Sequence, residues 1–136
     1  MKNEIPKGGV LLLYKPGGIT SHDAVAKVRR LYGTRSVGHT GTLDPMATGL
    51  LIMLVGKAVK ASDYVTAQDK IYDAEMKLGI VTDTADITGN ILSRSDYIPP
   101  RDEVISAAKS FVGRYMQVPP MYSAIKVDGK KLYELA

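Results

Sequence analysis

Two short, uninterrupted apolar runs constrain the fold more than any other feature of this sequence. They lie at residues 10–14 (VLLLY) and 50–55 (LLIMLV). Both are far shorter than the roughly 18 apolar residues that a membrane-spanning helix needs. Apolar runs of about four to eight residues are typical of buried strands. We therefore expect two core strands, and we expect residues 50–55 to be buried on both faces.

A helical pattern follows the first apolar run. Thr20 and Asp23 have the spacing of a capping box, which predicts a helix that begins at about Ser21. Gly33 then supplies a stop signal. The apolar residues recur at helical spacing and predict one face turned to the core, made of Val25, Val28, Leu31 and Tyr32.

The rest of the chain predicts an alternation of strands and helices. Residues 71–78 alternate between apolar and polar side chains, so they predict a half-exposed strand with Tyr72 on its apolar side. We also expect a helix over 57–67 and one strand near Ile91. A further helix is expected over 102–112, and its inward face consists of Val104, Ile105, Ala108, Phe111 and Val112. Asp128 and Gly129 predict a hairpin turn between strands at 122–127 and 130–133.

Positive charge is concentrated in the first half of the chain. Residues 1–60 contain nine Lys and Arg against three Asp and Glu, whereas residues 61–136 contain nine against eleven. Such an asymmetry indicates a surface that faces a polyanion, with nucleic acid as the first candidate. A solvated basic face with no partner explains the charge equally well.

Composition excludes several classes of protein. The chain has no cysteine, so disulfide frameworks and thiolate metal sites are excluded. The first nine residues are polar and predict no secretory signal, and no apolar run is long enough for a membrane span. We expect a cytoplasmic protein with no membrane association.

The densest group of reactive side chains is the string Gly-His-Thr-Gly-Thr-Leu-Asp-Pro-Met-Ala-Thr-Gly at residues 38–49. Functional side chains concentrate in loops on rigid scaffolds, and a carboxylate there, such as Asp44, can act as nucleophile or general base. The alternative is an Asx turn in which Asp44 binds its own backbone. His39 has a similar alternative, a hydrogen bond to nearby backbone. Neither a P-loop nor a dinucleotide-binding motif is present, and we expect no metal site.

Several motifs together carry a resemblance. Residues 9–21 (GVLLLYKPGGITS) and 41–49 (GTLDPMATG) resemble the opening and catalytic motifs of the bacterial tRNA pseudouridine synthase B family. Three further strings follow in family order: DKIY at 69–72, LGIVTDTAD at 78–86 and PMYSAIKVDGKKLY at 120–133. Tyr14 departs from the family, in which Asp often precedes Lys-Pro, but that position is not catalytic there.

The resemblance implies an α+β fold with a mixed, mainly antiparallel sheet flanked by helices. It also implies that residues 1–136 are the N-terminal half of the catalytic domain. No Gly-Thr-Tyr-x-Arg-like string occurs, although the family takes from it a second tyrosine and the basic partner of the catalytic carboxylate. The C-terminal RNA-binding domain is missing as well. We therefore expect a truncated chain that is inactive alone.

The resemblance also implies a function and a set of site residues. The function is isomerisation of a T-loop uridine in tRNA to pseudouridine, with Asp44 as the essential aspartate. Tyr72 is expected to stack on the target base, although simple core packing is its alternative. His39 is expected to enter the space left by the flipped base. Lys15 and Pro16 are expected to support the sheet, and substrate contacts are expected from Gly41, Thr42 and Leu43.

The expected partner is the T-arm stem-loop of tRNA, with no obligatory protein partner. Isomerisation needs neither a redox cofactor nor ATP, so we expect no cofactor. Backbone phosphates are expected to contact Lys27, Arg29, Arg30 and Arg35. Two alternatives stay open: a non-catalytic module that binds tRNA as a folding aid, and a guide-RNA-dependent relative of the dyskerin-like branch. The latter is less favoured because the chain shows no long basic N-terminal extension.

Overall fold

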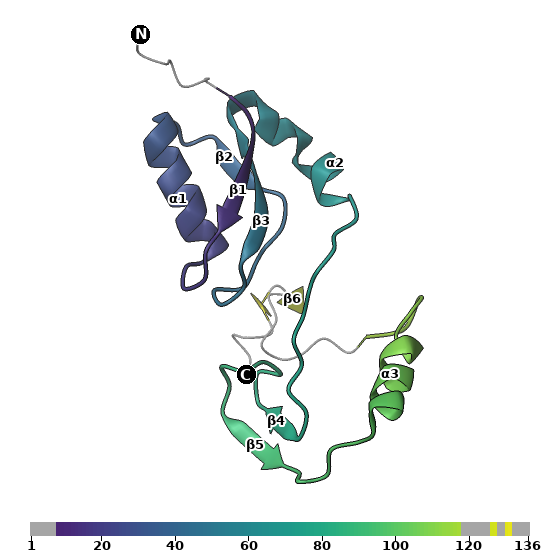
Figure 1. Cartoon of the computed structure of the whole chain (residues 1–136). Helices are drawn as coiled ribbons and strands as arrows, with labels where there is room; N and C mark the ends of the chain where they lie inside the picture. Colours follow the sequence, from purple (N-terminus) through teal and green to yellow (C-terminus); the bar gives the residue numbers. More distant parts are fainter. Residues whose placement is uncertain (1–7, 118–125, 128–129, 132–136) are drawn as a thin grey trace. The chain divides into compact units, whose positions relative to one another are not determined.

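The computed structural model describes residues 8–117, 126–127 and 130–131. The chain divides into two compact units, Met1–Tyr72 and Asp73–Ala136 (Figure 1). The first unit contains the Gly-rich loop and most of the predicted site residues, so it positions the candidate site.

A three-stranded antiparallel sheet forms the centre of the first unit. Its strands are β1 (Gly9–Lys15), β2 (Val37–His39) and β3 (Gly49–Val55), in the order β1-β3-β2. The pairing aligns Leu12 with Ile52 and His39 with Met53. Both apolar runs are strands, as predicted. The short β2 was not predicted, because three residues are too few to show alternation.

Helix α1 (Ser21–Tyr32) forms where the capping signals predicted it. The Thr20 hydroxyl accepts a hydrogen bond from the Asp23 amide at 3.0 Å, and the Asp23 carboxylate accepts one from the Thr20 amide at 2.8 Å. Gly33 ends the helix in the left-handed conformation, with φ of 60°, which glycine adopts without strain. The helix therefore has both ends fixed by local sequence.

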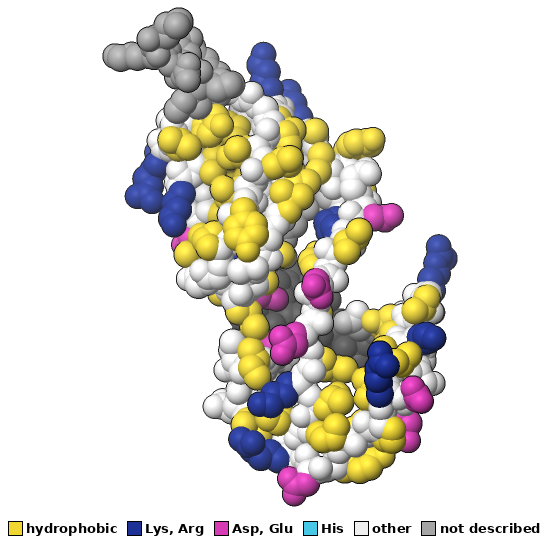
Figure 2. Space-filling view, viewed as in Figure 1, with side chains coloured by type: hydrophobic (Ala, Val, Ile, Leu, Met, Phe, Trp, Pro, Cys, Tyr) yellow, Lys and Arg dark blue, Asp and Glu magenta, His cyan; other side chains and the backbone are white. Residues whose placement is uncertain are grey.

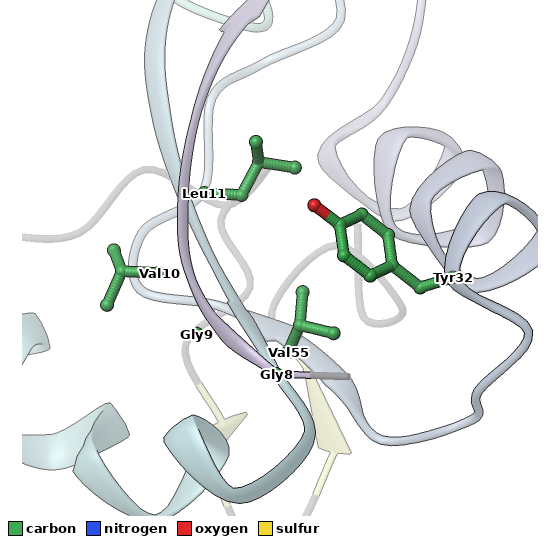
Figure 3. Close-up of a pocket in the computed structure, with 6 residues that line it drawn as sticks. All are labelled: Gly8, Gly9, Val10, Leu11, Tyr32 and Val55. Carbon is green, nitrogen blue, oxygen red and sulfur yellow. The ribbon is translucent and has the colours of Figure 1, made fainter. Parts of the chain in front are cut away.

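The hydrophobic core lies between α1 and one face of the sheet. Side chains of α1 pack there against alternate residues of the strands, but the prediction that Leu31 belongs to this face is wrong, because Leu31 is 63% exposed. In Figure 3, Tyr32 at the end of α1 lies beside Leu11 and Val55 at a small pocket, while Val10 points to the other side of the sheet. The buried residues of this core are Ala24, Val25, Val28, Val37, Leu51, Met53 and Val55.

The opposite face of the sheet is apolar and largely exposed. Leu12 is 66% exposed and Leu50 is 61% exposed, and Val10 and Tyr14 beside them are exposed too. Figure 2 shows apolar side chains gathered over β1 and β3. The prediction that β3 is buried on both faces is therefore wrong at Leu50, although Leu54 on the same face is buried. Helix α1 covers only one side of the strand.

The segment after β3 is helical at first and then irregular. A 3-10 helix, η1 (Gly56–Ala61), continues into α2 (Ser62–Thr66), which agrees with the helix predicted over 57–67. The strand predicted over 71–78 is wrong, because residues 69–77 form neither helix nor strand. Alternation alone does not make a strand when no neighbouring strand pairs with it.

The second unit contains the pair β4–β5, helix α3 and the pair β6–β7. Strands β4 (Ile80–Thr82) and β5 (Ile91–Arg94) pair antiparallel, so this region has two strands where one was expected. Gly79 precedes β4 with φ of 77°, and a Cβ at this position would lie 2.7 Å from the Ser95 carbonyl oxygen. Only glycine fits this start of the hairpin.

Helix α3 (Arg101–Ser110) lies within a residue or two of its predicted bounds. Its predicted inward face is wrong, because none of its residues is buried and Phe111 and Val112 just beyond it are exposed. Strands β6 (Lys126–Val127) and β7 (Lys130–Lys131) pair antiparallel, as the hairpin signal predicted. The rest of that hairpin, at 122–125, 128–129 and 132–133, lies outside the described residues.

Candidate active site

The Gly-rich loop between β2 and β3 is held by the sheet at both ends. His39 pairs with Met53 where the loop begins, and Gly49 pairs with Lys15 where it ends. The amide of Thr40, a buried residue, donates to the Ile52 carbonyl at 3.1 Å and extends the pairing by one residue. The loop is thus a short connection on a rigid scaffold, which is where reactive side chains are placed accurately.

Leu43 is anchored immediately before Asp44. The Ser21 hydroxyl accepts a hydrogen bond from the Leu43 amide at 2.9 Å and donates to the Leu43 carbonyl at 3.0 Å. The side chain of Leu43 packs against the core. The start of α1 therefore holds both the backbone and the side chain of the residue that precedes the candidate catalytic aspartate.

Pro45 is anchored immediately after Asp44. Its carbonyl accepts hydrogen bonds from the Gly18 amide at 2.8 Å and from the Lys15 ammonium at 3.3 Å. Lys15 is fully buried, and its ammonium also donates to the carbonyls of Pro16 at 2.9 Å and Ile19 at 2.8 Å. This lysine joins the turn after β1 to the loop, which agrees with its expected supporting role.

Asp44 combines a fixed backbone with an exposed carboxylate. Its carbonyl accepts a hydrogen bond from the Ala47 amide at 3.0 Å, and Pro45 restricts its backbone to extended conformations. Within the part of the chain that the structure describes, no hydrogen bond reaches the carboxylate, so the Asx turn is not formed. An exposed carboxylate with no internal partner can act as nucleophile or general base toward a bound ligand.

His39 lies at the start of the loop with its ring partly fixed. Its Nδ1 lies 2.6 Å from the Gly41 carbonyl oxygen. A carbonyl only accepts, so Nδ1 carries a proton and donates it to this oxygen. The backbone contact considered as the alternative is thus present, and the role in base flipping stays a prediction. Thr42 is exposed and Gly41 half-buried.

Tyr72 is the last residue of the first unit and is 66% exposed. Its ring is therefore not part of the hydrophobic core, and core packing does not explain this residue. The ring projects from the irregular segment rather than from the predicted strand. Its stacking on a base stays a prediction.

The predicted RNA-contacting residues are not equivalent. Lys27, Arg30 and Arg35 are exposed. Arg29 is half-buried, and its guanidinium donates to the Val37 carbonyl at 3.3 Å, so it contributes to the contact between α1 and β2. Helical spacing could not distinguish Arg29 from Arg30, because the burial of Arg29 depends on β2.

Three further lysines of the first unit were missed as site candidates. Lys57 and Lys60 are exposed on η1, three residues apart, and they belong to the basic excess already visible in the sequence. Lys70 lies beside the loop, since a Cβ built at Gly41 would be 3.8 Å from its Cε. The Lys70 ammonium donates to the carbonyls of Thr66 at 2.7 Å and Gln68 at 2.6 Å. No local sequence signal places Lys70 next to the loop.

Two carboxylates outside the loop have a pKa below the ordinary value of their type. The hydrogen bond from the Thr20 hydroxyl lowers the pKa of Asp23, and the hydrogen bond from the Thr88 hydroxyl lowers the pKa of Asp86. Both belong to turns or helix caps. Among residues 8–117, 126–127 and 130–131, no three His, Cys, Asp or Glu side chains gather closely enough to hold a metal ion. The helices within these ranges all lack the length and apolar content to cross a bilayer.

Comparison with known sequences gives a consistent set of relatives. A family model described as TruB family pseudouridylate synthase, N-terminal domain, matches residues 29–136. A tRNA pseudouridine synthase B of Clostridium novyi is 52% identical over 128 residues, which cover 94% of this chain and 44% of the relative. One of Bacillus licheniformis is 54% identical over 130 residues, covering 94% and 42%. The chain thus spans less than half the length of these relatives.

Solved structures resemble the chain as well. A chain in the crystal structure of a Cbf5-Nop10-Gar1 complex matches with a TM-score of 0.56 and 28% identity, covering 88% of this chain and 31% of that one. A chain in an H/ACA RNP bound to a substrate RNA containing 2'-deoxyuridine matches with a TM-score of 0.51 and 26% identity, covering 82% and 29%. These matches confirm the predicted α+β class with antiparallel strands flanked by helices.

Proposed function

The chain belongs to the TruB family of pseudouridylate synthases, as its motifs predicted, and on this basis we propose that it carries the catalytic loop of an enzyme that converts a uridine in tRNA to pseudouridine. The relatives that share half of its residues are named tRNA pseudouridine synthase B. The activity is assigned to the whole natural protein, since the chain spans only 42–44% of these relatives. Its 136 residues correspond to the N-terminal part of the catalytic domain.

The observation that carries the proposal is the state of Asp44. Its carboxylate is exposed, while the residues on both sides of it are anchored by α1 and by the turn after β1. In the proposed reaction Asp44 attacks the ribose or the base of the target uridine, and the bond between N1 and the ribose breaks. The detached uracil turns, its C5 bonds to the ribose carbon, and the bond to Asp44 breaks. C5 gives up its proton to water and N1 takes one up, so the product is an isomer of the uridine and no oxidant, reductant or ATP enters the balance.

The proposed substrate is a uridine in the T loop. To reach Asp44 the base must leave its stack, which costs a few kcal/mol. The exposed ring of Tyr72 offers a new stacking surface, and stacking on an aromatic side chain contributes about 1–3 kcal/mol per base. The exposed cations Lys27, Arg30 and Arg35 suit contacts to backbone phosphates. A tRNA substrate also fits a cytoplasmic location.

Substitution of Asp44 by Asn tests the proposal. The new bond forms at C5 of uracil, so tritium at that position is released as pseudouridine forms. In the natural protein that carries this sequence, Asp44→Asn should abolish tritium release from a T-arm stem-loop. Binding of the stem-loop should stay nearly unchanged, because phosphate contacts dominate affinity. Turnover within about tenfold of the unsubstituted protein would rule out a nucleophile role for Asp44.

A guide-dependent function is the second candidate, because the similar structures come from an H/ACA RNP and a Cbf5-Nop10-Gar1 complex. The higher identity to the tRNA enzymes, 52% and 54%, favours the first candidate. Tritium release from the stem-loop, measured without and then with added guide RNA, separates the stand-alone function from the guide-dependent one. Turnover on the bare stem-loop supports the stand-alone enzyme, and turnover only with added guide RNA supports the second candidate. Binding without turnover under either condition indicates a non-catalytic module.

A further inference from the structure

We propose that Ser21 is a positioning residue for Asp44, and that it acts together with Lys15 as a two-point clamp on the loop backbone. The inference rests on the proposed role of Asp44. It adds that the orientation of the carboxylate is set from outside the loop, by the first residue of α1 and the last residue of β1.

The first point of the clamp is the Leu43 backbone. Ser21 is only 3% exposed, and its hydroxyl uses its donor and one acceptor site on the same residue, at 3.0 Å and 2.9 Å. A helix start leaves its first side chain free for such a contact, because the capping bonds here are made by Thr20 and Asp23. The Ser21 hydroxyl therefore serves the loop and not the helix.

The second point is the Pro45 carbonyl. This carbonyl accepts hydrogen bonds from the Gly18 amide at 2.8 Å and from the buried Lys15 ammonium at 3.3 Å. Both donors come from β1 and the turn after it, so their positions are fixed by the pairing of Lys15 with Gly49. The two points bracket a single residue, Asp44.

The clamp has a catalytic consequence because it fixes the backbone that carries the carboxylate. In the described ranges no hydrogen bond fixes the Asp44 side chain, so its direction depends on its backbone. A displacement of about 1 Å at a reacting group can cost roughly 100-fold in rate. Loss of one clamp point should therefore lower turnover while leaving RNA contacts elsewhere intact.

The structural half of the test uses the natural protein that carries this sequence. In Ser21→Ala the Leu43 amide loses its acceptor, so its hydrogen exchange should become at least about tenfold faster. The Met53 amide in β3 serves as the internal reference and should keep its rate. If the Leu43 amide exchanges at an unchanged rate, the clamp does not exist.

The kinetic half uses the natural protein that carries this sequence. Ser21→Ala should lower kcat on the T-arm stem-loop about 10- to 100-fold while KM stays within about twofold. Ser21→Cys keeps a side chain of similar volume with a weaker hydrogen-bonding group, so its kcat should lie between those of the unsubstituted protein and Ser21→Ala. Val28→Ala is the control, since it removes core packing from the same helix but takes away no hydrogen bond to the loop. A kcat for Ser21→Ala within twofold of the unsubstituted protein, or one matched by Val28→Ala at equal folded fraction, overturns the proposal.

Asp44→Asn, measured in parallel, separates the two proposals. Turnover that survives in Asp44→Asn defeats the proposed function, whatever Ser21 does. Turnover that is lost in Asp44→Asn but retained in Ser21→Ala defeats only the clamp. If Ser21→Ala fails to fold, Ser21→Cys replaces it in both measurements. The proposal is then overturned if both kcat and the exchange rate of the Leu43 amide equal those of the unsubstituted protein.

Discussion

At Tyr72, an effect of substitution on RNA binding can be separated from an effect on folding. Because its ring is 66% exposed, Tyr72→Phe and Tyr72→Leu should both leave the melting temperature nearly unchanged. Tyr72→Phe keeps the ring face, so RNA affinity should be retained, whereas Tyr72→Leu should weaken it by about 1–3 kcal/mol. Thermal melting and binding to the T-arm stem-loop, measured for both variants, check this prediction. If Tyr72→Leu unfolds the chain but keeps full activity per folded molecule, the stacking role is wrong.

Asp86 gives a prediction for pH. Its carboxylate accepts hydrogen bonds from the Thr88 hydroxyl at 2.6 Å, the Thr88 amide at 2.7 Å and the Thr84 hydroxyl at 2.9 Å, which lower its pKa from 3.8. A lowered pKa in the folded state stabilises the β4–β5 turn fully above pH 3.8, and the stabilisation is lost as pH falls through the folded value. The Thr88 amide resonance should therefore move in acid, below pH 3.8, and Asp86→Asn should remove this transition. A transition that persists in Asp86→Asn assigns it to another group.

At the scale of elements, the two faces of the sheet predict opposite responses to the same substitution. Leu51 is 2% exposed beneath α1, and Leu12 is 66% exposed on the other face. Leu51→Ala should lower the free energy of unfolding by about 2–5 kcal/mol, as large-to-small core substitutions do. Leu12→Ala should cost less than about 1 kcal/mol, since little apolar contact is lost. Urea unfolding of both variants measures the difference, and equal costs would mean that the outer face is covered in solution.

The sequence predicted an element well where its signals were local. Helix α1 has its cap at Thr20, its stop at Gly33 and an apolar face, all within fourteen residues, and the structure confirms each except Leu31 on that face, which is 63% exposed. Strand pairing is not local. For this reason the alternation around Tyr72 predicted a strand that does not form, and β2, which is too short to alternate, was not predicted. The inward face predicted for α3 fails for the same reason, because burial depends on what packs against a helix.

The same distinction holds for the candidate site. The sequence placed Asp44 in a Gly-rich loop that leads into a buried strand, and the structure agrees, although it adds the unpredicted β2 before the loop. The contacts of Ser21 with Leu43 span 22 residues, and those of Lys15 with Pro45 span 30. No periodicity or spacing reports such contacts. Residue identity thus pointed to Asp44 as the candidate group, whereas the contacts that support it became visible only in three dimensions.

At the scale of the whole molecule, the charge asymmetry coincides with the division into units. The exposed cations Lys27 and Arg30 lie on α1 in the first unit, which also carries Asp44. The first unit contains ten basic and five acidic side chains, and the second contains eight basic and nine acidic ones. RNA that reaches Asp44 should therefore be attracted mainly by the first unit, because phosphate contacts release counterions and make binding salt-dependent.

Replacement of Lys27 and Arg30 together by Ala tests this view. Each phosphate contact contributes about 0.7–0.9 to the slope of log affinity against log salt concentration. The double variant should therefore reduce the slope by roughly one to two units and weaken binding of all RNA sequences alike. Replacement of Lys77 and Arg94, one exposed lysine and one exposed arginine of the second unit, removes the same charge and should leave the slope unchanged. Equal reductions in both double variants would show that net charge alone attracts the RNA, and an unchanged slope in the first would show that this face of α1 is merely solvated.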